Sequence, residues 1–248
     1  MENNFAGLNP RLANHVRLRY RFRVTEAFSC LDALQAVPGV RAGWAGRVPD
    51  VEISCDRDAA MRTLRPYHER FVAEFLGNRT GELWRAEQVH GSEVAVVPHT
   101  PVIVAPDGLP VVAGVDGLVT GVPGVVLAIY VADCGAIWLA DRVTGAVGLL
   151  HSGRKGTEAN IFKEALGKME LSFGTVAADV IAVLGPCIRP PHYEVDFAAD
   201  IASQAKELGV GTFHDCGLDT AADLERFYSY RAERGETGRM MALITRDA

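Results

Sequence analysis

Continuous apolar runs in the middle of the chain predict a group of buried strands. The run over Val125–Val131 follows a Pro-Gly pair and predicts a strand that is covered on both faces. Two shorter runs, Ile137–Ala140 and Ala146–Leu150, predict two more strands. The segment Asp141–Gly145 between them is short and contains glycine, so we expect a hairpin connection there.

The remaining apolar patterns predict further short strands and several helices. Strands are expected over Val16–Val24, Val40–Arg47, Leu83–Val89, Glu93–Val97, Val176–Leu184 and Met240–Thr245. Helices are expected over Phe28–Val37, Asp56–Gly77 and Asp219–Ala232, after an N-cap at Thr157, and from Phe197 to Gly209. Pro66 should kink the second of these helices or start a new one. We expect Pro101–Gly114 to be a loop.

This order of elements favours one fold class. Strands outnumber helices, are mostly short and often follow one another through hairpin-type links, which favours an α+β fold over a doubly wound sheet. No internal repeat or low-complexity linker divides the 248 residues. We therefore expect a single domain with mixed β-sheets flanked by helices.

Composition and charge limit the compartment and the partners that we expect for the protein. The formal net charge of -6 gives no basic footprint for nucleic acid. No apolar run reaches membrane-spanning length, and the N-terminus lacks the core of a signal peptide. The five cysteines are odd in number and widely spread, so they do not form a disulfide framework. We therefore expect a cytoplasmic protein without a nucleic-acid or membrane partner.

Three residues share one context, a strand end beside small residues or glycine: His90, Cys134 and His151. Two imidazoles and a thiolate are the ligands of a catalytic zinc site with one position left for water. Asp133, next to Cys134, could orient a histidine ligand or take a proton. The spacing matches no local metal motif, so inert packing residues and a metal-free pair of Cys134 and His151 remain alternatives.

The segment His151–Gly156 opens the next helix. Backbone N–H groups at a helix start, followed by Arg154 and Lys155, suit an anion such as phosphate. The segment is not a P-loop. The alternative is a helix start with solvated basic side chains.

Together these motifs resemble the YfiH-type laccase-domain family, also called polyphenol oxidase-like or purine nucleoside phosphorylase-like. The matching motifs, in the family's order, are QVHG from Gln88, VDGLVT from Val115, VADC from Val131, HSGRKG from His151, LGPCI from Leu184, YEV from Tyr193 and FYSYRAERGETGR from Phe227. The resemblance begins near Val40. We therefore expect an N-terminal extension at residues 1–39, packed on a laccase-domain-like metal-binding domain at residues 40–248.

The resemblance implies an α+β domain that binds zinc, with copper as the alternative metal, through His90, Cys134 and His151. It also implies a zinc-dependent purine nucleoside phosphorylase for adenosine, inosine and methylthioadenosine, together with adenosine deaminase activity. Its partners would then be a small purine nucleoside and phosphate. Some relatives are linked instead to editing of a wrongly built peptidoglycan precursor.

From the matching motifs we expect catalytic and substrate-binding residues around the metal ligands. Cys134, Asp133 and Lys155 are the catalytic candidates. The candidates for contact with substrate or phosphate are Gln88, Arg154, Lys155 and Arg231. Arg239 lies in the same C-terminal motif and could also meet a substrate, although residues of this kind are more often structural.

The chain departs from the family pattern in the helix-opening motif, which usually reads HAGWRG. Arg154 replaces the aromatic residue and removes a stacking surface, and Lys155 lacks the bidentate fork of the usual arginine. This leaves open an amidase that edits peptidoglycan precursors and a diverged, non-catalytic metal-binding relative. Polyphenol oxidation is disfavoured because a multicopper centre needs H-x-H pairs, and the seven histidines form none. A single copper in place of zinc remains an alternative.

Overall fold

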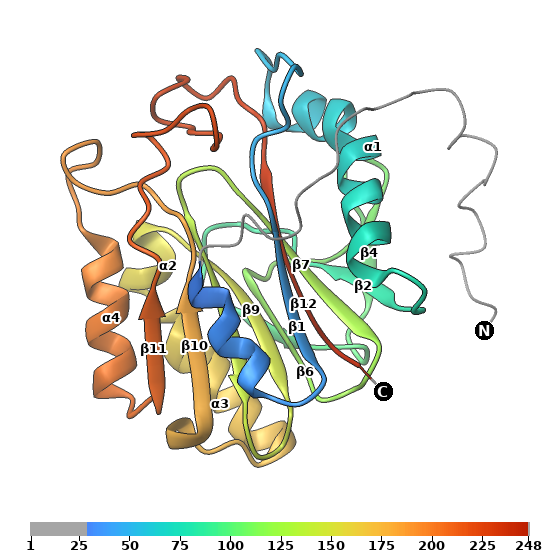
Figure 1. Cartoon of the computed structure of the whole chain (residues 1–248), viewed down its shortest axis with the longest axis vertical. Helices are drawn as coiled ribbons and strands as arrows, with labels where there is room; N and C mark the ends of the chain where they lie inside the picture. Colours follow the sequence, from blue (N-terminus) through green and yellow to red (C-terminus); the bar gives the residue numbers. More distant parts are fainter. Residues whose placement is uncertain (1–28, 248) are drawn as a thin grey trace.

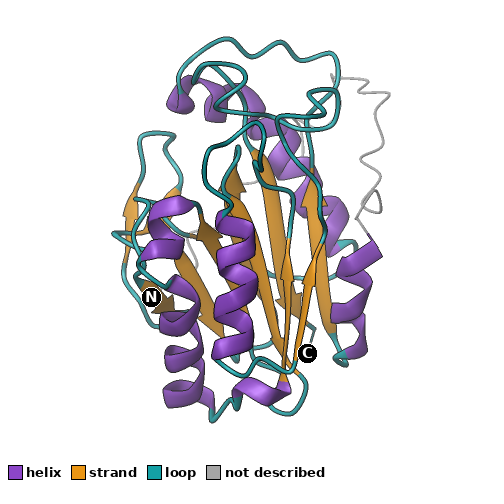
Figure 2. Ribbon diagram, turned by 90° about the vertical axis from the view of Figure 1, so that its left-hand side faces the viewer, coloured by secondary structure: helices purple, strands orange, loops and turns teal. Residues whose placement is uncertain are grey.

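The computed structural model describes residues 29–247. The strand expected over Val16–Val24 lies outside them. Two β-sheets pack face to face, and helices cover the outer face of each sheet (Figures 1 and 2). This arrangement confirms a single α+β domain with mixed sheets and flanking helices.

The first sheet has four strands in the order β1-β12-β7-β2. Strand β7 is antiparallel to β12 and parallel to β2, so the sheet is mixed. Helix α1, Arg57–Leu76, packs on its outer face through residues such as Phe71 and Phe75. The strands are β1 (Val40–Ala45), β12 (Met240–Arg246), β7 (Val125–Val131) and β2 (Glu82–Arg85).

The second sheet has six strands in the order β11-β10-β8-β9-β6-β3. Helices α3, Ile161–Phe173, and α4, Phe197–Glu207, pack on its outer face. The hairpin of β4 (Val102–Val104) and β5 (Pro110–Val112) forms a separate two-stranded sheet, and Val112 is bridged to Ala86 just after β2. The strands of the sheet are β11 (Thr212–Asp215), β10 (Val180–Leu184), β8 (Gly135–Asp141), β9 (Val147–Ser152), β6 (Gly117–Thr120) and β3 (Val94–Val96).

The main core lies between the two sheets. Trp138 on β8 is fully buried there, its indole ring 6.0 Å from that of Trp44 on β1. Its Nε1–H donates to the Leu243 carbonyl on β12 at 2.8 Å, which links the two sheets directly. The 3₁₀ helix Ser29–Ala36 (η2) contributes Leu31 and Leu34 to the same core. The boundary of the N-terminal extension at residue 39 stays a prediction.

Most predicted strands are confirmed, and the predicted limits of Val125–Val131 coincide with those of β7. The expected loop over Pro101–Gly114 is wrong in one respect, since it contains the short β4–β5 hairpin. Helix α1 continues through Pro66, so of the two alternatives for this proline the second helix start is wrong. Pro66 is exposed, so the carbonyl that loses its N–H partner lies on the solvent side of the helix.

Two other helix predictions also fail. Thr157 lies inside the short helix α2, Arg154–Glu158, and Asn160 caps α3 instead by accepting from the Lys163 N–H. The segment Asp219–Ala232 forms turns. Its N–H groups donate to carboxylates, Arg231 to Asp133 and Ser229 to Glu233, which replaces the helical hydrogen-bond ladder.

Candidate metal centre

Strand register brings Cys134 and His151 together at one end of the six-stranded sheet. Strands β8 and β9 are antiparallel, with Ala136 opposite His151. Cys134 directly precedes β8, so it lies where β9 ends. His90 comes from the turn after β2, in the other sheet. One ligand atom from each of these three side chains lies within 4.8 Å of the other two.

The charges of the cluster favour a thiolate. Burial alone would raise the pKa of Cys134, but His151 and His90 outweigh it and lower the pKa to about 6. Burial lowers the pKa of His151, whereas Cys134 and Asp116 raise it to about 9. A thiolate and two imidazoles within reach of one centre fit the ligand set of zinc, and also that of copper.

The carboxylate of Asp116 organises both histidines. His151 Nδ1 lies 2.8 Å from Asp116 Oδ1, which leaves Nε2 of His151 free for a ligand. The same carboxylate accepts the backbone N–H groups of Val89, His90 and Gly91 and so holds the turn that carries His90. Asp116 was not among the predicted site residues, although it lies in the VDGLVT motif. The signal that the sequence offered was an aspartate directly before an apolar strand, and the structure buries it fully.

Asp133 is bonded to two loops rather than to a histidine. Its carboxylate accepts the Thr220 hydroxyl at 2.7 Å and the Arg231 N–H at 2.7 Å, and its carbonyl accepts the Ile188 N–H at 2.8 Å. Burial raises the pKa of the Asp133 carboxyl. The residue also has a positive φ of 84°. These bonds fix the backbone next to Cys134, and the proposed proton transfer by Asp133 stays a prediction.

Close contact with Cys134 explains why the helix-opening motif has glycine at position 153. A Cβ atom at this position would lie 2.4 Å from Cys134 Sγ, far inside van der Waals contact. At Gly156 a Cβ would lie 3.1 Å from the Gly91 carbonyl oxygen. The start of α2 can therefore lie against Cys134 only because Gly153 has no side chain, and a side chain at Gly156 would crowd the His90 turn.

Two predicted substrate contacts have partners within the protein. The Gln88 side-chain amide donates to the Tyr130 carbonyl and accepts the Tyr130 N–H, so both of its ends bond to β7. The Arg231 guanidinium is exposed, pairs with Glu194 and lies over the Tyr193 ring. Gln88 thus holds the His90 turn to the neighbouring strand, and substrate contact by either residue stays a prediction.

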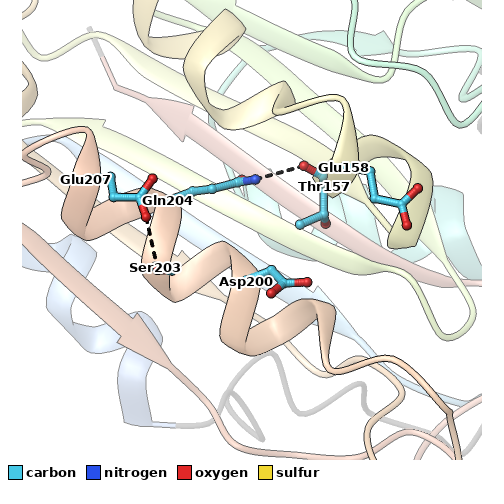
Figure 3. A pocket seen from close by; sticks show the side chains of 6 residues that line it. All are labelled: Thr157, Glu158, Asp200, Ser203, Gln204 and Glu207. Atoms are coloured by element: carbon cyan, nitrogen blue, oxygen red, sulfur yellow. Dashed lines mark hydrogen bonds between the residues drawn. The ribbon is translucent and has the colours of Figure 1, made fainter.

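Arg154 and Lys155 lie on the exposed side of α2. The Arg154 guanidinium pairs with Glu158 at 2.7 Å. Next to them, a shallow pocket between α2 and α4 carries three carboxylates and includes none of the three metal-ligand candidates (Figure 3). The pocket is lined by Thr157, Glu158, Asp200, Ser203, Gln204 and Glu207. An acidic lining disfavours phosphate, and the expected phosphate contacts of Arg154 and Lys155 stay predictions.

Comparison with known proteins gives consistent matches. Residues 56–200 and 195–247 match the family described as multi-copper polyphenol oxidoreductase laccase, and the matched residues include all three ligand candidates. A purine nucleoside phosphorylase of Deinococcus radiodurans is 32% identical over 231 residues, which cover 82% of this chain and 86% of that protein. The purine nucleoside phosphorylase YlmD of Geobacillus stearothermophilus is 30% identical over 72% of this chain and 77% of its own.

Solved structures support the fold. The crystal structure of YlmD from Geobacillus stearothermophilus matches with a TM-score of 0.71 and 24% identity, over 86% of this chain and 94% of that one. YfiH from Bacillus licheniformis matches with a TM-score of 0.66 and 24% identity, over 83% and 92% of the two chains. Within residues 29–247, no helix combines the length and apolar character needed to cross a membrane.

Proposed function

The chain belongs to the multi-copper polyphenol oxidoreductase laccase family, and from this premise we propose that it is a metal-dependent purine nucleoside phosphorylase. Relatives at about a third identity carry that activity in their names. The observation that carries the proposal is the convergence of His90, Cys134 and His151 within 4.8 Å. The proposed substrates are adenosine, inosine and methylthioadenosine, each with phosphate.

Phosphorolysis sets the demands on the site. A phosphate oxygen forms a bond to C1′ of the ribose while the bond from C1′ to the purine nitrogen breaks. The bonding electrons leave with the purine, which takes up a proton. The products are the free base and ribose 1-phosphate, or 5-methylthioribose 1-phosphate when the substrate is methylthioadenosine. The protein must therefore hold phosphate next to the sugar and align the two reactants.

The metal-ligand candidates and the residues that support them have separate roles. Zinc, or copper in its place, held by His90, Cys134 and His151 would supply a Lewis acid that polarises an oxygen of a reactant. Asp116 keeps His151 Nδ1 occupied and so turns Nε2 toward the centre. Asp133 anchors the loops on either side of Cys134.

One observation favours a second candidate, hydrolysis of an amide in a peptidoglycan precursor. The pKa of Cys134 is lowered to about 6 beside His151, the pattern of an activated thiolate nucleophile. Such an enzyme would use either Cys134 as a nucleophile without metal, or a water molecule activated by metal at the same proposed site. Adenosine deamination, which needs water rather than phosphate, is a further activity of the same proposed metal site.

Product analysis tests the proposal. Metal-loaded protein is incubated with adenosine, with and without phosphate. Phosphorolysis gives adenine and ribose 1-phosphate only when phosphate is present, whereas deamination gives inosine in both cases. If adenosine, inosine and methylthioadenosine all release no free base and adenosine is not deaminated, the nucleoside proposal fails and the amidase candidate takes its place.

The helix-opening motif offers a gain-of-function test. Arg154→Trp combined with Lys155→Arg supplies an apolar wall and a bidentate cation. We expect a higher kcat/KM for adenosine than in the unaltered protein. An unchanged kcat/KM would show that this face of α2 does not contact the nucleoside.

A further inference from the structure

The end of the four-stranded sheet next to the ligand candidates also carries two arginines. Met240, the first residue of β12, pairs with Val131, the last residue of β7, so Arg239 lies beside the segment that leads to Cys134. On the other side of β7, parallel β2 leads into the turn that carries His90. The start of α1, with Arg57, lies at this same end of the sheets (Figure 1).

Backbone carbonyls hold both guanidinium groups in place. Arg57 Nη2 donates to the carbonyl of Glu87, three residues before His90, at 3.0 Å. Arg239 Nη1 donates to the carbonyls of Thr237 and Gly238 at 3.1 and 2.9 Å. Among residues 29–247, neither arginine has a carboxylate within ion-pair distance. These bonds orient the two cations without neutralising them.

The two cations also act on each other. Burial and the nearby charge of Arg57 lower the pKa of Arg239, while Cys134 and Asp133 raise it. Arg239 is half-buried, so its charge is only partly screened by water. Two like charges at such a place are stabilised by an anion between them or beside them.

We propose that Arg57 and Arg239 form the phosphate subsite of this protein. Arginine side chains match phosphate oxygens bidentately, and these two lie at the same sheet end as Cys134 and the His90 turn. The choice of phosphate as the anion rests on the proposed phosphorolysis. On α2, by contrast, Arg154 is already paired with Glu158, beside a pocket that is acidic.

Direct binding of inorganic phosphate to the metal-loaded protein tests the subsite, by calorimetry or ³¹P NMR. We expect Arg57→Gln and Arg239→Gln each to weaken phosphate binding roughly tenfold or more, since each removes a charge-assisted hydrogen bond to the anion. The matched control is Arg142→Gln. Arg142 is an exposed arginine that also donates to backbone carbonyls, those of Ala178 and Asp179, and it lies at the β8–β9 hairpin away from the site. Its loss should leave phosphate binding unchanged.

The variants separate the possible results. Arg57 is exposed on the first turn of α1, so its variant should fold, and Arg239→Lys should restore part of the binding that Arg239→Gln loses. The subsite is wrong if the unaltered protein binds no phosphate, if Arg57→Gln binds it as well as Arg142→Gln does, or if only Arg154→Gln with Lys155→Gln loses it. Phosphate binding that depends on Arg57 and Arg239, in a protein that cleaves no nucleoside, would support the subsite and reject the proposed function.

Discussion

The sulfur of Cys134 can occupy its position because Gly153, which lies against it, has no side chain. In Gly153→Ala, the added Cβ would lie 2.4 Å from Sγ, so the sulfur must move. Metal sites tolerate displacements of only about 0.5 Å, and we expect metal binding to weaken roughly tenfold or more. Titration of the purified variant with zinc, followed by calorimetry, measures the change.

Gly167→Ala is the matched control for this substitution. Gly167 lies within α3, and a Cβ there would meet nothing within 4 Å. We expect this variant to bind metal normally and to gain about 0.5–1 kcal/mol of unfolding free energy. Equal metal affinities in the two variants would show that the close approach of Gly153 to Cys134 has no effect on the site.

Asp116 should affect metal affinity without touching the metal. In Asp116→Asn, the amide can no longer accept every bond that the carboxylate accepts from His151 and the His90 turn. We expect metal affinity to fall about 10- to 100-fold. A second buried carboxylate, Asp107, pairs with Arg85 at 2.5 Å and serves as the control. Asp107→Asn should lower stability but leave metal affinity unchanged; the same affinity loss in both variants would point to general destabilisation.

At the residue scale, the sequence was informative where chemistry alone selects a residue. His90, Cys134 and His151 stood out because two imidazoles and a thiol at strand ends suggest a metal. Asp116 was missed because its importance comes from bonds to segments far away in the chain. The crowding that explains Gly153 likewise exists only once Cys134 lies against α2.

At the scale of elements, a buried histidine on helix α1, His68, makes the free energy of unfolding depend on pH. Burial lowers the pKa of His68 from 6.5 to about 4. Its Nε2 lies 3.0 Å from the Arg239 carbonyl oxygen, while its buried Nδ1 has no hydrogen-bond partner among the described residues. Protonation of both ring nitrogens of His68 would therefore place an N–H group in a buried position without a hydrogen-bond acceptor.

This shift gives a pH dependence with a definite sign. The unfolded chain takes up a proton as the pH falls through 6.5, but folded His68 does so only near 4. The stability is fully present above pH 6.5, and about 3 kcal/mol of unfolding free energy is lost on acidification to pH 4. In His68→Gln, which keeps a donor for the Arg239 carbonyl, urea unfolding should depend less on pH across this range. An identical pH dependence would exclude His68 as the cause.

Elements could be predicted where burial determines the order of apolar residues. The prediction failed where side chains accept the backbone N–H groups that a helix would use. Strand β7 is apolar at every position, so its limits could be predicted from the run of hydrophobic residues. Over Asp219–Ala232, the apolar spacing of Phe227 and Tyr228 indicated a helix. Both residues are buried, but the carboxylates of Asp133 and Glu233 take the N–H groups that a helix would use. The Asp133 acceptor lies 98 residues away in the chain, so it cannot be inferred from local spacing.

At the scale of the whole molecule, the candidate centre lies at the seam between the two sheets. β7 belongs to the four-stranded sheet and β8 to the six-stranded sheet, so the chain changes sheet across Ala132–Cys134. His90 approaches from the first sheet, and Cys134 and His151 stand at the end of the second. The α+β class could be predicted from the order of strands and helices, but this change of sheet could not, because both strands are equally apolar.

Because Cys134 lies at a sheet end, outside the cores between the layers, its loss should affect the metal more than the fold. Metal analysis of protein purified without an affinity tag, beside a Cys134→Ser variant prepared identically, tests the central claim most directly. We predict one zinc or copper ion per chain in the unaltered protein, little or none in the variant, and the same circular dichroism spectrum for both. A protein that neither retains nor takes up metal, or a folded variant that binds metal as tightly as the unaltered protein, would contradict the account.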